Sequence, residues 1–499
     1  MSDKTLAINP YENFPPRQLD RLTILFILAT FTIGGGVAVV VGQFGYFALL
    51  VVPGAIVAVA AIRQPALGFA GLLLLIFTQL NQVLDLYHEG IPSPARALVA
   101  LLVVVILVRI LLYGERPAGW IRTSFILGVY ILFLLVSMVN AQDFEVAKDS
   151  FVNITQNILI AIIVIYFIKH PESLQLALWT LIAAGIFMGT ISVFQYLTGT
   201  FGNNYWGFGG WELQQSGGIS RQRLTGPYYN PNAYAQVLVV IIPLAVDRLW
   251  HERRLILRLI AAWGALVCIL AVIFTFSRNG FVSMLFAIGI LFVLRRPNLL
   301  PSILSVALLV GVLQFIPATY LDRISSLVQI SSGQAGIVAD ESFRGRLSEN
   351  VAAIQMFQDH PVFGVGLNNF QFEYQDYSRR IGLDPRRELR SPASLYLEIL
   401  SEQGLFGVAI FGYLIFTVFR RLFSALSYFK RNNFSDLEYL STALVASFGG
   451  YMFLAISKNS AYSNVYWSLA AIALSVDQIV KNLKEKTEQD TEDIVEQSE

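Results

Sequence analysis

Apolar residues along the chain gather in runs of about twenty, and short polar or arginine-bearing turns separate these runs. About twenty apolar residues in a helix cross the hydrocarbon core of a bilayer, whereas a membrane-spanning strand needs only about ten. Because a helix satisfies its own backbone hydrogen bonds in lipid, the pattern predicts an all-α integral membrane protein, a polytopic helical bundle. The predicted spans cover residues 22–41, 43–62, 66–83, 96–113, 123–140, 151–168, 174–197, 233–249, 256–276, 280–294, 299–317, 403–420, 438–457 and 464–480.

Composition agrees with this pattern. The 499 residues are 55% hydrophobic and only 14% charged, whereas a soluble globular chain is about 25% charged. The runs therefore predict about 12–14 transmembrane helices, the lower number applying if short runs merge or re-enter the membrane. The lipid bilayer is the first partner that the sequence predicts.

Composition also excludes several kinds of site. A net charge of +1 gives no overall field that would attract a polyanion, so no nucleic-acid partner is expected. Cys268 is the single cysteine, and the four histidines lack metal-ligand spacing, so neither a disulfide nor a metal centre is expected. The sequence predicts no metal and no cofactor.

The distribution of cations predicts the orientation in the membrane. If the N-terminus is cytoplasmic, the short turns on that side carry repeated arginines, including the clusters within 248–258 and 420–431. The opposite short turns hold only Arg96, Lys148, Arg278 and Lys458. This bias places both termini of the predicted multi-pass membrane protein in the cytoplasm. The first run lacks a cleavage site, so we expect it to be retained as an anchor.

Two long outward-facing segments, 198–232 and 318–402, interrupt the short turns. Long loops in compact proteins are usually functional or disordered, and the abundance of Trp, Tyr, Phe and Gly here favours order. We expect 318–402 to fold as short helices over an outward-facing cavity. The predicted organisation is a cytoplasmic segment 1–21, helices 22–197, helices with arginine-bearing outer motifs 198–317, a large outer loop 318–402, helices 403–480 and a disordered charged tail 481–499.

The first candidate site is the motif SRQRLTGPYYNPNAYA, residues 220–235. Arg221 and Arg223 precede a Gly-Pro turn, and Asn230 is placed to cap the helix that follows. A helix N-terminus beside a guanidinium is a suitable place for a phosphate. The alternative is a simple turn and cap with solvated arginines.

The second candidate site is TFSRNGF, residues 275–281, at the outer end of a predicted span. Arg278 lies between two apolar helices, near the membrane surface. A charged side chain is costly at the edge of a membrane, so Arg278 is a candidate functional residue. The alternative is that Arg278 extends to lipid head groups.

The third candidate site lies in the long loop. Residues 346–356 form an amphipathic pattern that ends at His360-Pro361, and Glu398 and Glu402 follow at i, i+4 spacing. Two carboxylates on one helix face could perform acid–base chemistry. A solvated helix face is the alternative interpretation.

Taken together, RQRLTGPYYNPNAYA, TFSRNG, HPVFGVGLNNF and SLYLEILSEQGLFG resemble the O-antigen ligase and polymerase superfamily of bacterial envelope glycosyltransferases. The resemblance covers about residues 220–410, with the motifs in the expected order. It implies transfer of a glycan, without a metal or cofactor, from an undecaprenyl-diphosphate carrier at the outer face of the inner membrane. The acceptor would be another glycan, a lipid such as the lipopolysaccharide core, or a protein, and polysaccharide assembly proteins are implied as further partners.

The resemblance also implies roles for individual residues. Arg223 and Arg278, with Arg221, would hold the diphosphate, whose departure develops negative charge that guanidinium groups stabilise. Aromatic side chains in and after FGNNYWGFGGW would offer flat faces for sugar rings; an interfacial aromatic belt is the alternative. The glycan-binding candidates are Trp206, Trp211 and Tyr228.

One position departs from the family. The histidine that precedes the LYLE segment in such proteins corresponds to Ala393, and alanine cannot accept a proton. Either Glu398 or His360 takes that catalytic role, or the chain does not perform this transfer. Two alternatives therefore stay open, a transporter or permease for a small solute and a non-catalytic member of a polysaccharide assembly complex.

Overall fold

The computed structural model describes residues 64–87, 93–115, 117, 119–216, 219–295, 341–382 and 389–498. The described residues from Phe69 onward belong to one compact unit. The predicted spans 22–41, 43–62 and 299–317 lie outside the described residues.

The described part of the chain is a bundle of membrane-spanning helices, which confirms the predicted fold class. Nine of its helices are long and apolar enough to cross a bilayer. Helices α3 (Pro65–Phe77) and α4 (Leu80–Tyr87) form a further candidate span that bends by 60° at its break. The nine are α5 (Pro94–Tyr113), α6 (Trp120–Ser137), α7 (Phe144–Phe167), α8 (Pro171–Thr198), α9 (Pro231–His251), α10 (Leu255–Phe274), α11 (Arg278–Arg295), α16 (Leu395–Arg431) and α17 (Ser435–Leu454).

Local sequence fixes where these helices begin. Asn230 caps α9, as the sequence predicts, because its Oδ1 accepts hydrogen bonds from the amides of Asn232 and Ala233, both at 3.0 Å. Pro231 occupies the first helical position, where no amide hydrogen is needed. Asp143 caps α7 in the same way, through the amide of Val146 at 3.1 Å. The helix starts are therefore set by side chains next to them in sequence.

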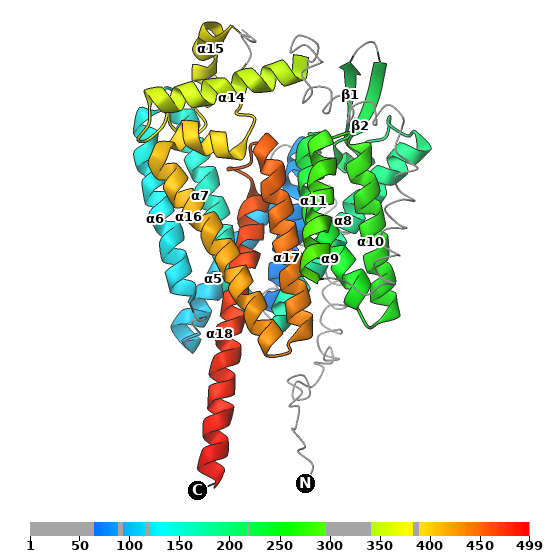
Figure 1. The fold of residues 1–499 in the computed structure, drawn as a ribbon, viewed down its shortest axis with the longest axis vertical. Helices are drawn as coiled ribbons and strands as arrows, with labels where there is room; N and C mark the ends of the chain where they lie inside the picture. Colours follow the sequence, from blue (N-terminus) through cyan, green and yellow to red (C-terminus); the bar gives the residue numbers. More distant parts are fainter. Residues whose placement is uncertain are drawn as a thin grey trace, which may run out of the picture. The chain divides into compact units, whose positions relative to one another are not determined.

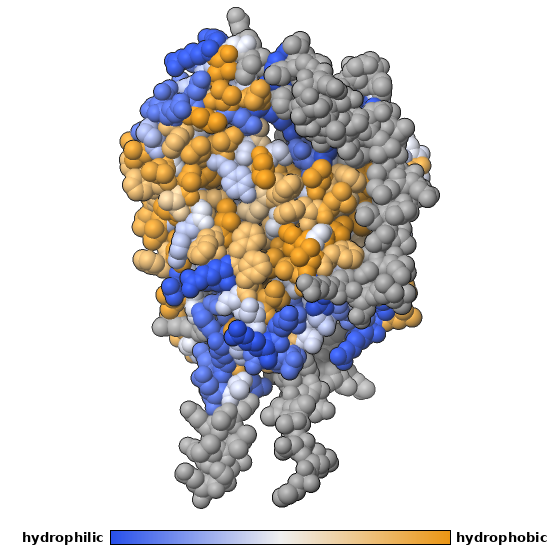
Figure 2. Space-filling view, in the orientation of Figure 1, coloured by the Kyte–Doolittle hydropathy of each residue, from blue (hydrophilic) through white to orange (hydrophobic). Residues whose placement is uncertain are grey.

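The interior of the bundle is built around α9 and α17, whose residues are mostly buried. Glycine allows the closest packing there, because a Cβ on Gly450 of α17 would lie 2.7 Å from the Cβ of Ala287 on α11. Helices α5 and α6 instead expose large apolar side chains, including Leu111, Leu112 and Phe125. Figure 2 shows such side chains gathered in an apolar band between two polar ends, the surface that a bilayer would cover.

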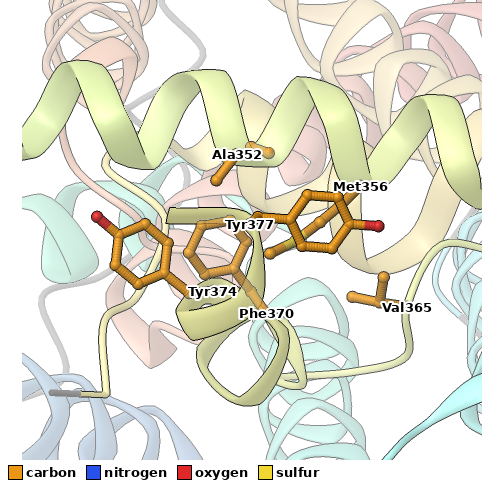
Figure 3. Close-up of a cluster of buried hydrophobic side chains, with 7 residues drawn as sticks. Ala352, Met356, Val365, Phe370, Tyr374 and Tyr377 are labelled. Carbon is orange, nitrogen blue, oxygen red and sulfur yellow. The ribbon is translucent and has the colours of Figure 1, made fainter. Parts of the chain in front are cut away.

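One end of the bundle carries additional structure (Figure 1). Strands β1 (Trp211–Ser216) and β2 (Ile219–Leu224) form an antiparallel hairpin. Helices α14 (Glu341–Asp359) and α15 (Phe370–Ile381) belong to the predicted outer loop, which confirms its helical character. They pack through buried side chains drawn in Figure 3, namely Ala352, Met356, Val365, Phe370, Tyr374 and Tyr377.

The last helix, α18, runs from Asn464 to Ser498. Its first half contains the predicted span 464–480 and is buried among its neighbours, with Leu469 and Ile472 fully inaccessible. The helix then continues beyond the bundle, at the end opposite α14 and the hairpin (Figure 1). The sequence predicts a disordered tail from residue 481; the structure has helix there, since nothing in the segment breaks the pattern before Ser498.

Candidate functional site

Arg278 is the first residue of α11 and follows a tight break after α10. Phe276 turns the chain with a φ of 50°, a left-handed conformation that a bulky residue rarely adopts. The hydroxyl of Ser277 then accepts a hydrogen bond from the amide of Gly280 at 3.1 Å. This turn fixes the guanidinium-bearing residue at the beginning of a helix, and such strain is typical of functional sites.

Arg223 lies on β2 and is held against the same turn. Its Nε donates to the carbonyl of Thr275 at 2.8 Å, and its Nη1 donates to Glu212 Oε1 at 2.9 Å. The side chain is about 10% exposed. The structure therefore anchors Arg223 to a residue only three positions before Arg278, although the two arginines are far apart in sequence.

The N-termini of α9 and α11 also meet at this place. Ser277 Oγ donates to Asn232 Oδ1 at 2.7 Å, which joins the first turn of α9 to the turn before α11. A Cβ on Gly280 would lie 2.6 Å from the Cβ of Ala235, so glycine is required for this approach. Two positive helix ends thus lie beside Arg278.

Glu212, the ion-pair partner of Arg223, was not among the residues predicted from the sequence. Glu212 lies opposite Arg223 in the hairpin register, and Ser216 lies opposite Ile219. The Gly217-Gly218 pair between two short strand-like runs is a hairpin signal. Counting outward from that two-residue turn pairs Glu212 with Arg223, so the local sequence contains the signal for this contact.

The other residues of the hairpin region have distinct environments. Arg221 is partly exposed on β2, opposite Gln214. The hydroxyl of Tyr228 donates to the carbonyl of Phe77 at 2.7 Å. The indole Nε1 of Trp211 likewise donates a hydrogen bond to the carbonyl of Phe201 at 2.6 Å.

Trp206 differs from Trp211 and Tyr228, because it is 85% exposed in a left-handed backbone conformation with φ of 54°. Of the three aromatic candidates, it is the one that presents its ring to the surroundings. An exposed aromatic face in a fixed backbone is suited to stacking on a sugar ring.

Glu398 and Glu402, both in the first turns of α16, are buried rather than on a solvated face, with exposures of 3% and 1%. Glu398 Oε2 accepts from the amides of Ser460 at 3.1 Å and Ala461 at 3.0 Å. Glu402 Oε2 accepts from the hydroxyl of Tyr462 at 2.5 Å and from the amide of Asn368 at 2.9 Å. The two carboxylates tie α16 to the outer loop and to the turn before α18.

Tyr462 contributes a phenol to this cluster. Burial, with the nearby Glu402 and Glu398, raises the pKa of Tyr462 well above its ordinary value. The phenol therefore stays protonated throughout the physiological pH range and donates a hydrogen bond to Glu402.

Replacing Glu398 by alanine is expected to destabilise the protein, because the amides of Ser460 and Ala461 would lose their buried acceptor. Each such loss costs about 1–3 kcal/mol. The measurement is the thermal unfolding midpoint in detergent. The matched control is Glu145→Ala, which removes an exposed carboxylate of α7 and should change stability by less than about 1 kcal/mol. Equal midpoints for the two variants would contradict the anchoring role.

His360 and Ala393 lie in different parts of the outer region. His360 is exposed just after α14, where its amide donates to Met356 O at 2.8 Å and its carbonyl accepts from Gly364 N at 3.1 Å. Ala393 is half-buried just before α16. The next two residues contact the turn after α17, through Ser394 Oγ to Ala455 O at 3.4 Å and Leu395 N to Lys458 O at 3.2 Å.

The two parts of the outer region are connected by α9. Gln236, one turn after Asn232, places its Nε2 3.5 Å from Ser460 Oγ, and Ser460 binds Glu398. Asn232 in turn contacts Ser277. The structure thus brings Arg223, Arg278 and the carboxylate cluster to one end of the bundle. Among the residues that the structure describes, no group of three or more His, Cys, Asp or Glu could hold a metal ion.

Comparison with known proteins finds a related family. The family model described as O-antigen ligase matches residues 263–412, a segment that contains Arg278, His360, Glu398 and Glu402. No curated protein matches the chain. The matched segment contains the TFSRNG, HPVFGVGLNNF and SLYLEILSEQGLFG motifs, whereas RQRLTGPYYNPNAYA precedes it. This match supports the resemblance of this multi-pass membrane protein to the O-antigen ligase superfamily.

Proposed function

We propose that this protein transfers a glycan from an undecaprenyl-diphosphate carrier to an acceptor at the outer face of the inner membrane. The observation that carries this proposal is the attachment of Arg223 to the turn that starts α11 at Arg278, through the 2.8 Å hydrogen bond to Thr275. A diphosphate needs positive charge near the membrane surface, and the two arginines at this turn would supply it.

The chemistry follows from the charge that develops during transfer. When the bond between the anomeric carbon and the diphosphate oxygen breaks, the oxygen gains negative charge. Guanidinium groups and the backbone amides at a helix N-terminus stabilise such an anion without reorganising. Arg278, Arg223 and the adjoining first turns of α9 and α11 would provide these donors, with Arg221 at the edge of the hairpin.

The surroundings suit the two halves of a lipid-linked substrate. The apolar band in Figure 2 would accommodate the polyprenyl chain in the membrane, and the exposed ring of Trp206 would contact sugar residues outside it. A glycan, lipid or protein acceptor would approach from the same side, beneath α14 and α15.

The orientation follows the distribution of cations. The end of the bundle opposite the hairpin carries Arg248, Arg253, Arg254, Arg295, Lys430 and Arg431, at the ends or starts of α9, α10, α11 and α16. The positive-inside rule assigns this end to the cytoplasm. The C-terminus and, by the same rule, the N-terminus would be cytoplasmic, and Arg223 and Arg278 would face outward.

One observation favours a transporter instead. The candidate span α3–α4 is broken with a 60° bend, and Gln79 at the break has a φ of 53°. Broken helices often form substrate sites in transporters. Here the break is filled by protein, since Gln79 Nε2 donates to Ile76 O at 3.0 Å and to Asn464 Oδ1 at 3.2 Å.

Reconstitution distinguishes these functions. Purified protein in liposomes is given an undecaprenyl-diphosphate-linked oligosaccharide with candidate glycan and lipid acceptors, and glycan products are separated by chromatography. Matched liposomes without the lipid-linked sugar are tested for uptake of free sugars. We expect product only in the first arm. Solute uptake without transfer would identify a transporter, and neither activity would favour a non-catalytic role in an assembly complex.

A further inference from the structure

We propose that Glu212 is a positioning residue for Arg223, which it holds in the orientation that binds the diphosphate of the donor. This inference rests on the proposed function, since it concerns the same arginine. It assigns a role to an acidic residue beside a site for an anion. Glu212 would act through the guanidinium of Arg223, without contacting the substrate.

The hairpin places Glu212 directly opposite Arg223. In the antiparallel register of β1 and β2 the two residues are cross-strand partners, so their side chains lie on the same face of the hairpin. Glu212 Oε1 accepts a hydrogen bond from Arg223 Nη1 at 2.9 Å. A shift of register by one residue would move the carboxylate to the other face. The register of the hairpin therefore determines this ion pair.

The backbone next to the ion pair is fixed at the base of the hairpin. The carbonyl of Gly210, two residues before Glu212, accepts hydrogen bonds from the amides of Thr225 at 2.9 Å and Gly226 at 3.1 Å. A Cβ on Gly210 would lie 2.3 Å from the carbonyl oxygen of Gly226, so only glycine permits this approach. The strand that carries Glu212 is thus bound to the segment that follows Arg223.

Two hydrogen bonds from different nitrogens determine the orientation of the Arg223 guanidinium. Its Nε donates to the Thr275 carbonyl at 2.8 Å, which attaches the side chain to the turn before α11. One hydrogen bond alone would let the planar group rotate about it, and the second, from Nη1 to Glu212, removes that rotation. A guanidinium binds phosphate oxygens best through two parallel N–H groups, so the orientation of its plane matters as well as its distance.

The burial of the pair is asymmetric, which distinguishes it from an ordinary surface ion pair. The Glu212 side chain is 41% exposed, whereas that of Arg223 is only 10% exposed. Ion pairs between two exposed residues contribute little, because water screens both charges. A mostly buried cation needs a fixed partner, since an unpaired charge away from water is costly. Water around the exposed part of the carboxylate weakens its repulsion of a bound diphosphate.

Positioning and simple charge predict opposite effects on donor binding. If Glu212 were only a nearby negative charge, its removal would strengthen binding of the negatively charged donor, because like charges repel. If Glu212 positions Arg223, its removal weakens donor binding and slows transfer, although the site becomes more positive. The sign of the change therefore separates positioning from a general electrostatic effect.

The first test uses the full-length protein in liposomes with an undecaprenyl-diphosphate-linked oligosaccharide and an acceptor. Glu212→Ala should lower kcat/KM for the donor by about 10-fold to 10²-fold, because a displacement of about 1 Å can cost that much. Glu212→Gln keeps an oxygen that accepts from Nη1 and should restore most of the activity. Glu212→Asp should stay impaired, since its carboxylate is one methylene shorter. The matched control, Glu145→Ala, removes another ion-paired carboxylate and should retain the wild-type rate.

A double-mutant cycle tests whether Glu212 acts through Arg223. In an Arg223→Ala background the carboxylate has no guanidinium to position, so Glu212→Ala should cause no further loss of activity. An equal loss with and without Arg223 would overturn the assignment. Thermal unfolding midpoints are measured for each form, and Glu212→Asp, which keeps the charge, replaces Glu212→Ala in the cycle if the alanine variant unfolds at a lower temperature.

Binding of inorganic pyrophosphate, measured by calorimetry in detergent, separates this inference from the proposed function. Wild type and Glu145→Ala should bind pyrophosphate equally, and Glu212→Ala about tenfold more weakly. Unchanged or tighter binding in Glu212→Ala, or wild-type kcat/KM in that variant while transfer still depends on Arg223, would overturn the role of Glu212 and leave the function standing. Weaker binding in Glu212→Ala, without transfer by any form, would contradict the proposed function and leave Glu212 positioning an anion site. Neither binding nor transfer by the wild type would contradict both.

Discussion

Replacing Arg278 by alanine is expected to lower glycan transfer by at least about 10²–10³-fold, the usual effect of removing one donor to a developing anion. Arg278 begins α11 beside the first turn of α9, so its loss removes positive charge from the proposed diphosphate site. The measurement is the transfer rate of purified variants from an undecaprenyl-diphosphate-linked oligosaccharide.

The matched control is Arg96→Ala, because Arg96 is an exposed arginine that also lies in the first turn of a span, α5. This control should retain the wild-type rate. Arg278→Lys should recover only part of the activity, since an ammonium cannot form the two parallel hydrogen bonds of a guanidinium. Equal rates for Arg278→Ala and Arg96→Ala would contradict a diphosphate site at this turn.

Arg223 allows a stricter test of the same site. Its Nε holds the Thr275 carbonyl of the turn, so removing it should both reduce local charge and loosen Arg278. Residues that act as a unit show non-additive effects. The double variant Arg223→Ala, Arg278→Ala should therefore lose less activity than the product of the two single losses. If the loss of activity in the double variant equals the product of the two single losses, the two arginines act independently.

Replacing Gly364 by alanine is expected to disrupt folding of the outer region. The chain segments 361–366 and 401–405 cross there, and Gly364 has a φ of +68°. A Cβ on Gly364 would lie 2.3 Å from the carbonyl carbon of Glu402, a contact that only backbone displacement could relieve. Left-handed strain and overpacking together cost about 2–5 kcal/mol.

The measurement is the unfolding midpoint and the yield of folded protein in detergent, with Gly412→Ala as control. Gly412 lies within α16, and no atom comes within 4 Å of the Cβ position, so alanine should be neutral or stabilising by up to about 1 kcal/mol. Gly404→Ala should resemble Gly364→Ala, because its Cβ would lie 2.6 Å from the backbone of Val362. If Gly364→Ala is as stable as the wild type, the chain segments 361–366 and 401–405 do not lie this close together.

The sequence predicted the helices well because their signals are local. Apolar runs of bilayer length, the Asn230 cap and the Ser277 turn depend on neighbours a few residues away, and the structure has helices at those places. It did not predict that Arg223 binds the turn before Arg278, since that contact joins residues 52 apart. Long-range contacts of this kind are set by how helices pack, which periodicity does not encode.

The carboxylates show the same difference. Their i, i+4 spacing correctly places Glu398 and Glu402 together on α16, but the spacing could not tell a solvated face from a buried one. Glu398 is buried against a turn more than sixty residues later in the sequence, where it accepts hydrogen bonds from the amides of Ser460 and Ala461. The hairpin around Gly217-Gly218 is a different case, because its signal is local and the sequence contains it.

Under the proposed function, a diphosphate leaves at the turn that holds Arg223 and Arg278. Mass spectrometry of the lipid released by wild-type protein with lipid-linked oligosaccharide and acceptor tests this leaving group. We predict intact undecaprenyl diphosphate, one molecule for each new glycosidic bond, with release at least about 10²-fold slower from Arg278→Ala. Release of undecaprenyl phosphate with a sugar phosphate, or equal release by wild type and Arg278→Ala, would contradict the account.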